Sequence, residues 1–150
     1  MDRVAVALGS NLGDRRAHLD YAVSRLRQIL TDLRVSCYVE TEPVGAAGPQ
    51  PPYLNAAATG LCALPPRALL ETLLAIEQER GRERPMANAA RTLDLDLLLF
   101  GDRRIDEAGL VVPHPRFRER RFVLEPLAGI APDLIDPVSG CAVAELLARL

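Results

Sequence analysis

The spacing of apolar and polar residues divides the first part of the chain into strands and a helix. The apolar run over Arg3–Leu8 predicts a buried first strand, and Gly9–Gly13 predicts a tight turn after it. Apolar residues at every third or fourth position predict an amphipathic helix from Asp14, its N-cap, to about Leu30. Alternation of apolar and polar side chains over Leu33–Thr41 predicts a second strand.

A segment rich in proline and glycine, residues 42–52, then interrupts this pattern. An irregular segment of this length in a compact domain is typically functional or disordered. The pattern resumes in a third strand over Tyr53–Cys62. A second helix is expected between Pro65 and Gly81, because proline is tolerated in the first turn of a helix and glycine commonly ends one.

The rest of the chain is organised around a fourth, strongly apolar strand, Arg91–Phe100. A polar loop over Arg82–Ala90 precedes it. Short extended pieces over Ile105–Val112, a helix or helical turn over Arg116–Leu124 and a small helix over Val143–Ala148 follow. This order of elements predicts an α+β fold, a ferredoxin-like sandwich with a mainly antiparallel sheet, helices packed on one face and C-terminal additions. At 150 residues, the chain is expected to form one domain, 1–150.

Composition excludes some classes of function. The net charge of −2 argues against a general nucleic-acid or membrane-surface binder, and no apolar run reaches membrane-spanning length. All 18 basic residues are arginine, so phosphate-loop and Schiff-base lysines are excluded. Three cysteines, far apart in the sequence, indicate neither a disulfide framework nor a zinc site. With no cationic leader at the N-terminus, we expect a cytoplasmic protein.

Two carboxylates lie within the fourth strand. Side chains alternate faces along a strand, so Asp94 and Asp96 share one face while Leu93, Leu95 and Leu97 share the other. Residues two apart on a strand are separated by roughly 6–7 Å, which lets two carboxylates flank or share divalent cations about 3.5–4 Å apart. The alternative is an amphipathic strand with one face in water.

Four further positions carry candidate chemistry, each with a structural alternative. Tyr53 and Asn55 share a face of the third strand, where a ring beside an amide suits a flat heterocycle, although Tyr53 also fits an ordinary strand start. Glu77 continues the apolar stripe of the second helix, where a carboxylate is costly unless it is paired or the stripe opens into a cleft; the alternative is an edge position with its head group in water. Prolines on both sides fix the backbone around His114, which is catalytic or structural.

Strand carboxylates, arginines on either side of them and one conformationally fixed histidine are the groups that metal-assisted phosphoryl-type transfer needs. Mg²⁺ prefers oxygen ligands and is usually shared with nucleotide phosphates, and arginine binds phosphate oxygens through two N–H groups. From the residues alone, the alternative is a regulatory module that binds a small ligand at its loops.

Six short motifs resemble one family in their order and approximate spacing. They are Gly9-Ser10-Asn11, Tyr53-Leu54-Asn55-Ala56-Ala57, Arg82-x-Arg84, Arg91-Thr92-Leu93-Asp94-Leu95-Asp96, Val112-Pro113-His114 and Arg120-x-Phe122. Together they span about Val4 to Pro132 and resemble 6-hydroxymethyl-7,8-dihydropterin pyrophosphokinase, a folate-pathway enzyme. The Arg-Thr-Leu-Asp-Leu-Asp run is the most specific of them.

The resemblance implies transfer of a pyrophosphoryl group from ATP, the co-substrate, to the hydroxymethyl oxygen of a reduced pterin, with release of AMP. It implies two Mg²⁺ ions on Asp94 and Asp96, with Arg82 and Arg91 as further catalytic residues. The implied pterin-binding residues are Thr41, Pro43, Val44, Tyr53, Asn55 and Phe122, and the implied nucleotide-binding residues are Glu77, Arg82, Arg84, Arg91, His114 and Arg120. We expect a monomer that acts on small molecules and binds neither nucleic acid nor membrane.

The loop over Arg82–Ala90 departs from the resembled family. Family members often carry Trp-Gly-Pro before the arginine of the Arg-Thr-Leu-Asp run, whereas this chain has Asn88-Ala89-Ala90 there and no tryptophan at all. The resemblance therefore implies a lid over Arg82–Ala90 that is looser than in relatives or built differently.

Overall fold

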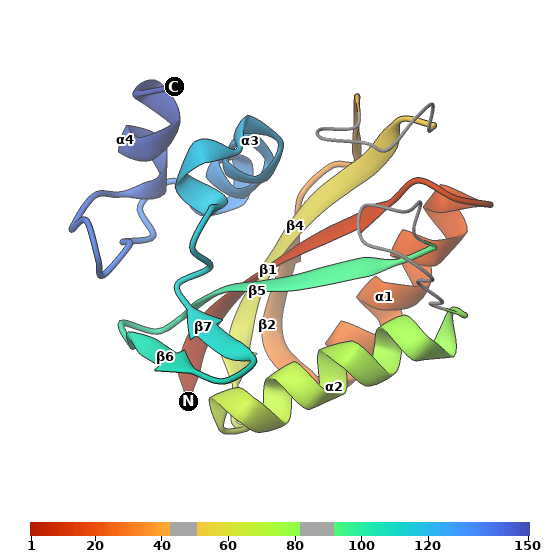
Figure 1. The fold of residues 1–150 in the computed structure, drawn as a ribbon, viewed down its shortest axis with the longest axis horizontal. Helices are drawn as coiled ribbons and strands as arrows, with labels where there is room; N and C mark the ends of the chain where they lie inside the picture. Colours follow the sequence, from red (N-terminus) through yellow and green to blue (C-terminus); the bar gives the residue numbers. More distant parts are fainter. Residues whose placement is uncertain (43–50, 82–91) are drawn as a thin grey trace.

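The fold is taken from a computed structural model, which describes residues 1–42, 51–81 and 92–150. Figure 1 shows a central sheet with two long helices, α1 and α2, on one side and two shorter helices, α3 and α4, near the C-terminus. The elements in chain order are β1 (Asp2–Ser10), α1 (Arg15–Ile29), β2 (Leu30–Val35), β3 (Val39–Thr41), β4 (Tyr53–Cys62), α2 (Pro66–Glu79), β5 (Asp94–Phe100), β6 (Ile105–Glu107), β7 (Leu110–Val112), the 3₁₀ helix η1 (Phe117–Glu119), α3 (Arg121–Ile130) and α4 (Val143–Ala148).

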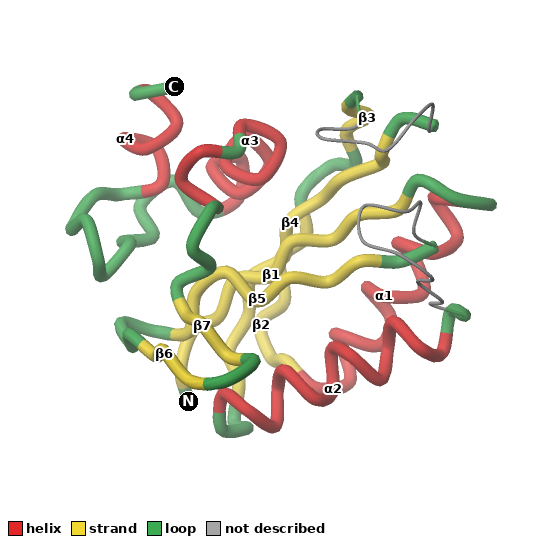
Figure 2. The backbone as a smooth tube through the Cα atoms, in the orientation of Figure 1, coloured by secondary structure: helices red, strands yellow, loops and turns green. Residues whose placement is uncertain are grey.

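The central sheet has the strand order β2-β4-β1-β5, with β3 also paired to β4 (Figure 2). Every pairing in it is antiparallel. β6 and β7 form a separate two-stranded hairpin. An antiparallel sheet with packed helices confirms the expected α+β class, and it leaves β5 at an edge of the sheet.

Helices cover both faces of the sheet, not one face as expected. α1 and α2 pack against Val4, Val6 and Leu8 of β1 to form the larger core. Valine and leucine side chains of α3 and α4 pack on the opposite face, against Ala5 and Ala7. The expectation of one covered face is therefore wrong, because the C-terminal segment carries enough apolar side chains to form a second core.

The helix boundaries follow local signals in the sequence. Asp14 is the N-cap of α1, and its carboxylate accepts a hydrogen bond from the backbone N–H of Ala17 at 3.1 Å. α2 begins at Pro66, and the chain leaves it through Gly81 at a φ of +75°, a conformation that glycine adopts without strain. These ends confirm the expected helices.

Two expected strands have different limits in the structure. β1 runs on to Ser10, so Gly9 belongs to the sheet and pairs with β4 instead of forming a turn. The single strand expected over Leu33–Thr41 is divided into β2 and β3. Between them, the backbone N–H of Ser36 donates to the carbonyl of Ala57, and the Ser36 hydroxyl accepts from the N–H of Ala57, both at 2.9 Å. A side-chain oxygen thus replaces a backbone acceptor and interrupts the strand.

The helical turn expected over Arg116–Leu124 is also divided, into η1 and α3, and α3 continues to Ile130. The three cysteines are free thiols, with Cys37 exposed and the other two buried. In the part of the chain that the structure describes, no helix is long and apolar enough to cross a membrane.

Candidate active site

The two aspartates lie on the face of β5 that is turned away from α2. Leu93, Leu95 and Leu97 are buried in the core with α1 and α2. Since side chains alternate along a strand, Asp94 and Asp96 point to the other face, where both are half-buried. The predicted alternation is therefore confirmed.

Strand register brings Asn55 into line with these carboxylates. Gly9 lies directly opposite Asn55 on one side and Asp94 on the other, and Ala7 in the next row lies opposite Asp96. Side chains directly opposite one another in an antiparallel pair share a face of the sheet. Asn55, Asp94 and Asp96 therefore face the same side, above the small residues of β1.

Gly9 forms the floor of this side of the sheet, the Gly9 face. A Cβ atom at Gly9 would lie 3.2 Å from Oδ1 of Asn55 and 3.5 Å from Cδ1 of Tyr53, so both side chains lean over the space that a larger residue would fill. Sequence reasoning assigned Gly9 to a turn and missed this role. The available signal was the run of small residues at alternate positions of β1, Ala5, Ala7 and Gly9.

Three of the residues expected to bind the pterin lie together at one end of β4. Thr41 on β3 is directly opposite Tyr53 on β4. The Asn55 side-chain amide donates a hydrogen bond to the hydroxyl of Thr41, which fixes the orientation of that amide. Asn55 is 6% exposed, so it is a buried polar group oriented by a neighbour.

His114 lies close to Asp94 and Arg120. The backbone N–H of His114 donates to the carbonyl of Leu98 at 2.9 Å, which attaches the residue to β5. Burial lowers the pKa of His114, the guanidinium of Arg120 lowers it further, and the carboxylate of Asp94 opposes both effects. His114 is therefore neutral at pH 7.

The neutral ring of His114 has a defined tautomer. Its Nδ1 accepts a hydrogen bond from the backbone N–H of Arg116 at 3.2 Å. The proton of the neutral ring therefore lies on Nε2, which is the nitrogen able to donate to an anion.

Arg120 connects this histidine to Phe122, the fourth residue expected at the pterin that lies within the described part of the chain. The Arg120 guanidinium carbon lies 5.6 Å from the centre of the Phe122 ring. Phe122 packs against the second core, and its helix α3 contacts β4. The structure therefore places Arg120 near His114, and Phe122 on the side of the sheet that carries the aspartates.

Glu77 is buried, with 1% of its surface exposed. Its Oε2 accepts a hydrogen bond from the backbone N–H of Leu95 at 2.7 Å. Glu77 is therefore a paired carboxylate in the interior and not an edge residue with its head group in water, while its expected place at the nucleotide stays a prediction. The remaining expected site residues, Pro43, Val44, Arg82, Arg84 and Arg91, and the expected lid over Arg82–Ala90, lie outside the described residues.

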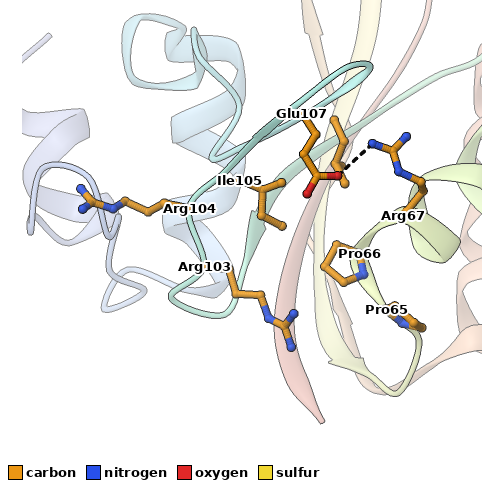
Figure 3. Close-up of a pocket in the computed structure, with 8 residues that line it drawn as sticks. Pro65, Pro66, Arg67, Arg103, Arg104, Ile105 and Glu107 are labelled. Atoms are coloured by element: carbon orange, nitrogen blue, oxygen red, sulfur yellow. Dashed lines mark hydrogen bonds and ion pairs between the residues drawn. The ribbon is translucent and has the colours of Figure 1, made fainter.

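A hollow of about 510 Å³ lies at the other end of the sheet (Figure 3). Arg103 in its lining pairs with Asp2, the first residue of β1, whereas the aspartates lie beside Gly9 near the last. Arg67 pairs with Glu107 at 3.1 Å, and the charges facing the hollow are thereby balanced in part. The Gly9 face, not this hollow, carries the two aspartates expected to be catalytic.

The residues present fit a divalent metal that takes some of its ligands from the protein and the others from a substrate. No group of three or more histidine, cysteine or acidic side chains able to hold a metal occurs among residues 1–42, 51–81 and 92–150. Mg²⁺ is commonly held by one or two carboxylates together with substrate phosphates and water, so the pair Asp94 and Asp96 suffices for that mode of binding.

A face that combines a carboxylate pair with an arginine and a histidine has groups that suit an enzyme transferring phosphoryl groups with a divalent metal. The chain belongs to the 7,8-dihydro-6-hydroxymethylpterin-pyrophosphokinase family, whose family model matches residues 5–132. This membership confirms the resemblance carried by the six motifs.

Individual relatives agree with the family match. The chain is 42% identical to a 2-amino-4-hydroxy-6-hydroxymethyldihydropteridine pyrophosphokinase of Synechocystis over 97% of this chain and 74% of the relative. It is 43% identical to the enzyme of that name from Pseudomonas aeruginosa, over 99% of this chain and 91% of the relative.

A solved structure of an HPPK-DHPS in complex with substrates has the same fold, with a TM-score of 0.80 at 13% identity. That match covers 99% of this chain but only 43% of the other one, so the chain spans less than half of that longer protein.

Proposed function

We propose that this chain transfers the pyrophosphoryl group of ATP to the hydroxymethyl group of 6-hydroxymethyl-7,8-dihydropterin, releasing AMP in folate biosynthesis. The observation that carries the proposal is the row Asn55, Gly9 and Asp94 across the sheet, in a chain of this family. In this row, the amide of Asn55 can form hydrogen bonds to a heterocycle, and the carboxylate of Asp94 can bind a metal. The hydroxymethyl oxygen forms a bond to the β-phosphorus, and the bond from that phosphorus to the oxygen shared with the α-phosphate breaks.

Asp94 and Asp96 are the residues that would hold two Mg²⁺ ions. Bound there with the triphosphate, these ions would neutralise its charge and favour ionisation of the attacking hydroxyl. The protein's own contribution is to present both carboxylates on one face of β5, opposite Gly9 and Ala7 on the neighbouring strand β1. A narrow floor of small side chains lets the phosphates approach the sheet closely.

Asn55 would read the polar edge of the pterin, with Thr41 orienting its amide through the hydrogen bond between them. Tyr53 and Phe122 would enclose the flat ring, because aromatic side chains stack favourably on heterocycles. Pro43 and Val44, which lie outside the described residues, are proposed to complete the pocket through backbone contacts.

His114 and Arg120 would bind the nucleotide phosphates. The neutral His114 donates through Nε2, and Arg120 supplies positive charge next to it. Arg82, Arg84 and Arg91 are proposed as further phosphate ligands, and Arg82 and Arg91 as catalytic residues that stabilise charge on the transferred group. Catalysis then consists of positioning and charge neutralisation, with little need for a protein base.

We further propose that residues 1–150 form one pyrophosphokinase domain with a ferredoxin-like arrangement, acting as a monomer. The strand order β2-β4-β1-β5 supports that arrangement, because α1 and α2 each connect two parallel strands that have one antiparallel strand between them. A small-ligand regulatory module with the same fold is not favoured, since the family and its named relatives are pyrophosphokinases.

The direct test is to incubate the protein with ATP, Mg²⁺ and the reduced pterin and to separate the nucleotides. We expect AMP in an amount equal to the pyrophosphorylated pterin, and none when the pterin or Mg²⁺ is omitted. Formation of ADP would instead indicate transfer of a single phosphoryl group. Saturable binding of both ligands without any product would support the regulatory module.

A further inference from the structure

Glu77 is an acidic side chain on the buried, mainly apolar face of α2. It lies on the same face of α2 as Leu73 and Ile76, both fully buried, and only 1% of its own surface is exposed. A buried carboxylate is costly unless hydrogen bonds or charges compensate for its lost hydration. Its hydrogen bond to the N–H of Leu95, at 2.7 Å, supplies part of that compensation.

Leu95 lies between the two aspartates of the active site, on a strand at the edge of the sheet. In an antiparallel sheet, the backbone N–H and C=O of one residue point toward the strand on one side, and those of the next residue point toward the other side. The N–H of Leu95 points to α2, so the backbones of Asp94 and Asp96 point to β1, where they pair with Gly9 and Ala7. Glu77 therefore supplies the acceptor that a further strand would supply at this edge.

The position of Glu77 separates it from the carboxylates that it supports. α2 packs on the face of β5 that carries Leu93, Leu95 and Leu97, whereas Asp94 and Asp96 are directed to the opposite face. Any effect of Glu77 on these two side chains through the Leu95 hydrogen bond passes through the backbone of β5. This geometry favours a supporting role over direct contact with the nucleotide.

We propose that Glu77 is a positioning residue, which fixes the backbone at Leu95 so that Asp94 and Asp96 keep the separation and direction needed to hold divalent metal. This inference rests on the proposed function of the aspartate pair. It assigns Glu77 its effect through a hydrogen-bond acceptor, not through negative charge at the substrate. Partners that orient metal ligands in this way typically change metal affinity or activity by 10- to 100-fold when they are removed.

Two substitutions separate the acceptor from the charge. Glu77→Gln keeps a carbonyl oxygen at the end of a side chain of the same length, whereas Glu77→Met keeps the length but removes the acceptor. Glu71 is exposed on the same helix, so Glu71→Gln and Glu71→Met are matched controls. We would measure Mn²⁺ affinity with α,β-methylene ATP present, hydrogen exchange at the Leu95 amide, and kcat and KM for the pterin.

For Glu77→Gln, we expect Mn²⁺ affinity and kcat within about threefold of the parent and a protected Leu95 amide. For Glu77→Met, we expect about 10- to 100-fold weaker Mn²⁺ binding, a fall in kcat with little change in KM for the pterin, and exchange of the Leu95 amide at least tenfold faster. Both Glu71 variants should match the parent.

A Glu77→Gln protein as impaired as Glu77→Met would overturn the proposal, because the charge would then be what matters. Unchanged Mn²⁺ affinity in a folded Glu77→Met protein would also overturn it, leaving a purely structural carboxylate. If Glu77→Met does not fold, the Mn²⁺ affinity of Glu77→Gln and the hydrogen exchange of its Leu95 amide still test the proposal. Absence of AMP in the parent protein would refute the proposed function alone, since Mn²⁺ affinity and amide exchange do not depend on turnover.

Discussion

An ion pair between Arg118 and Asp136 joins the segment that carries His114 and Arg120 to the C-terminal part of the chain. Replacing Asp136 tests how much this ion pair stabilises the fold. Asp136 is fully buried, and the Arg118 guanidinium donates to it through two nitrogens. The Ser139 hydroxyl at 2.6 Å and the Val138 N–H at 3.1 Å donate to the same carboxylate. Asp136→Asn removes the charge and one of the two acceptor oxygens and keeps the size of the side chain.

The pKa of Asp136 provides the magnitude. Burial raises this pKa, but the hydrogen bonds from Arg118, Ser139 and Val138 outweigh burial and hold it at about 2, against 3.8 for an ordinary aspartate. A depression of this size corresponds to about 2 kcal/mol of folding free energy when the carboxylate is ionised. Because the folded pKa is lowered, this stability is fully present above about pH 4 and is lost as the pH falls toward 2.

Urea unfolding at a series of pH values measures the effect. At pH 7, we expect Asp136→Asn to lose about 2 kcal/mol of unfolding free energy. Between pH 5 and pH 2, the parent should lose about 2 kcal/mol more than the variant, because the variant has no carboxylate to protonate at this position. Asp133→Asn, an exposed change in the same segment, should behave like the parent. Equal pH dependence in the parent and Asp136→Asn would refute the reasoning.

Three further predictions concern the Gly9 face. Asp94→Asn and Asp96→Asn should each lower Mg²⁺-dependent turnover at least about a hundredfold, with circular dichroism and the urea midpoint nearly unchanged, and near-normal turnover in either would contradict the metal assignment. Asn55→Ala should weaken pterin binding roughly tenfold while binding of an ATP analogue is unaffected, as calorimetry with each ligand would show; equal losses for both ligands would count against a pterin role. Gly9→Ala should also weaken pterin binding in the same assay, because its methyl group would meet Asn55 at 3.2 Å, and unchanged affinity would mean that the site tolerates a larger floor.

Local periodicity was enough to predict much of the site. A period of two places Asp94 and Asp96 on one face whatever surrounds the strand, and the structure confirms it. Asp14 marked the start of α1, and the limits of β4 and α4 agree with the expected strand and helix. These features depend on backbone geometry and on side chains a few residues apart, so the sequence contains the information directly.

Long-range pairing decided the rest. The register that sets Asn55 and Asp94 on either side of Gly9 pairs residues that lie 46 and 85 positions apart along the chain, and no local pattern specifies it. The break at Ser36 depends on Ala57 of another strand, and the second covered face depends on where the C-terminal helices dock.

Side-chain alternation along a strand is a local property, so the sequence was enough to predict which residues of the candidate site share a strand face. The position of Gly9 beneath Asn55, and the hydrogen bond from the backbone between the two aspartates to the Glu77 carboxylate, follow from the folded chain alone. Strand pairing and helix docking join groups distant in sequence, and burial then makes a hydrogen-bond partner essential for each polar group enclosed.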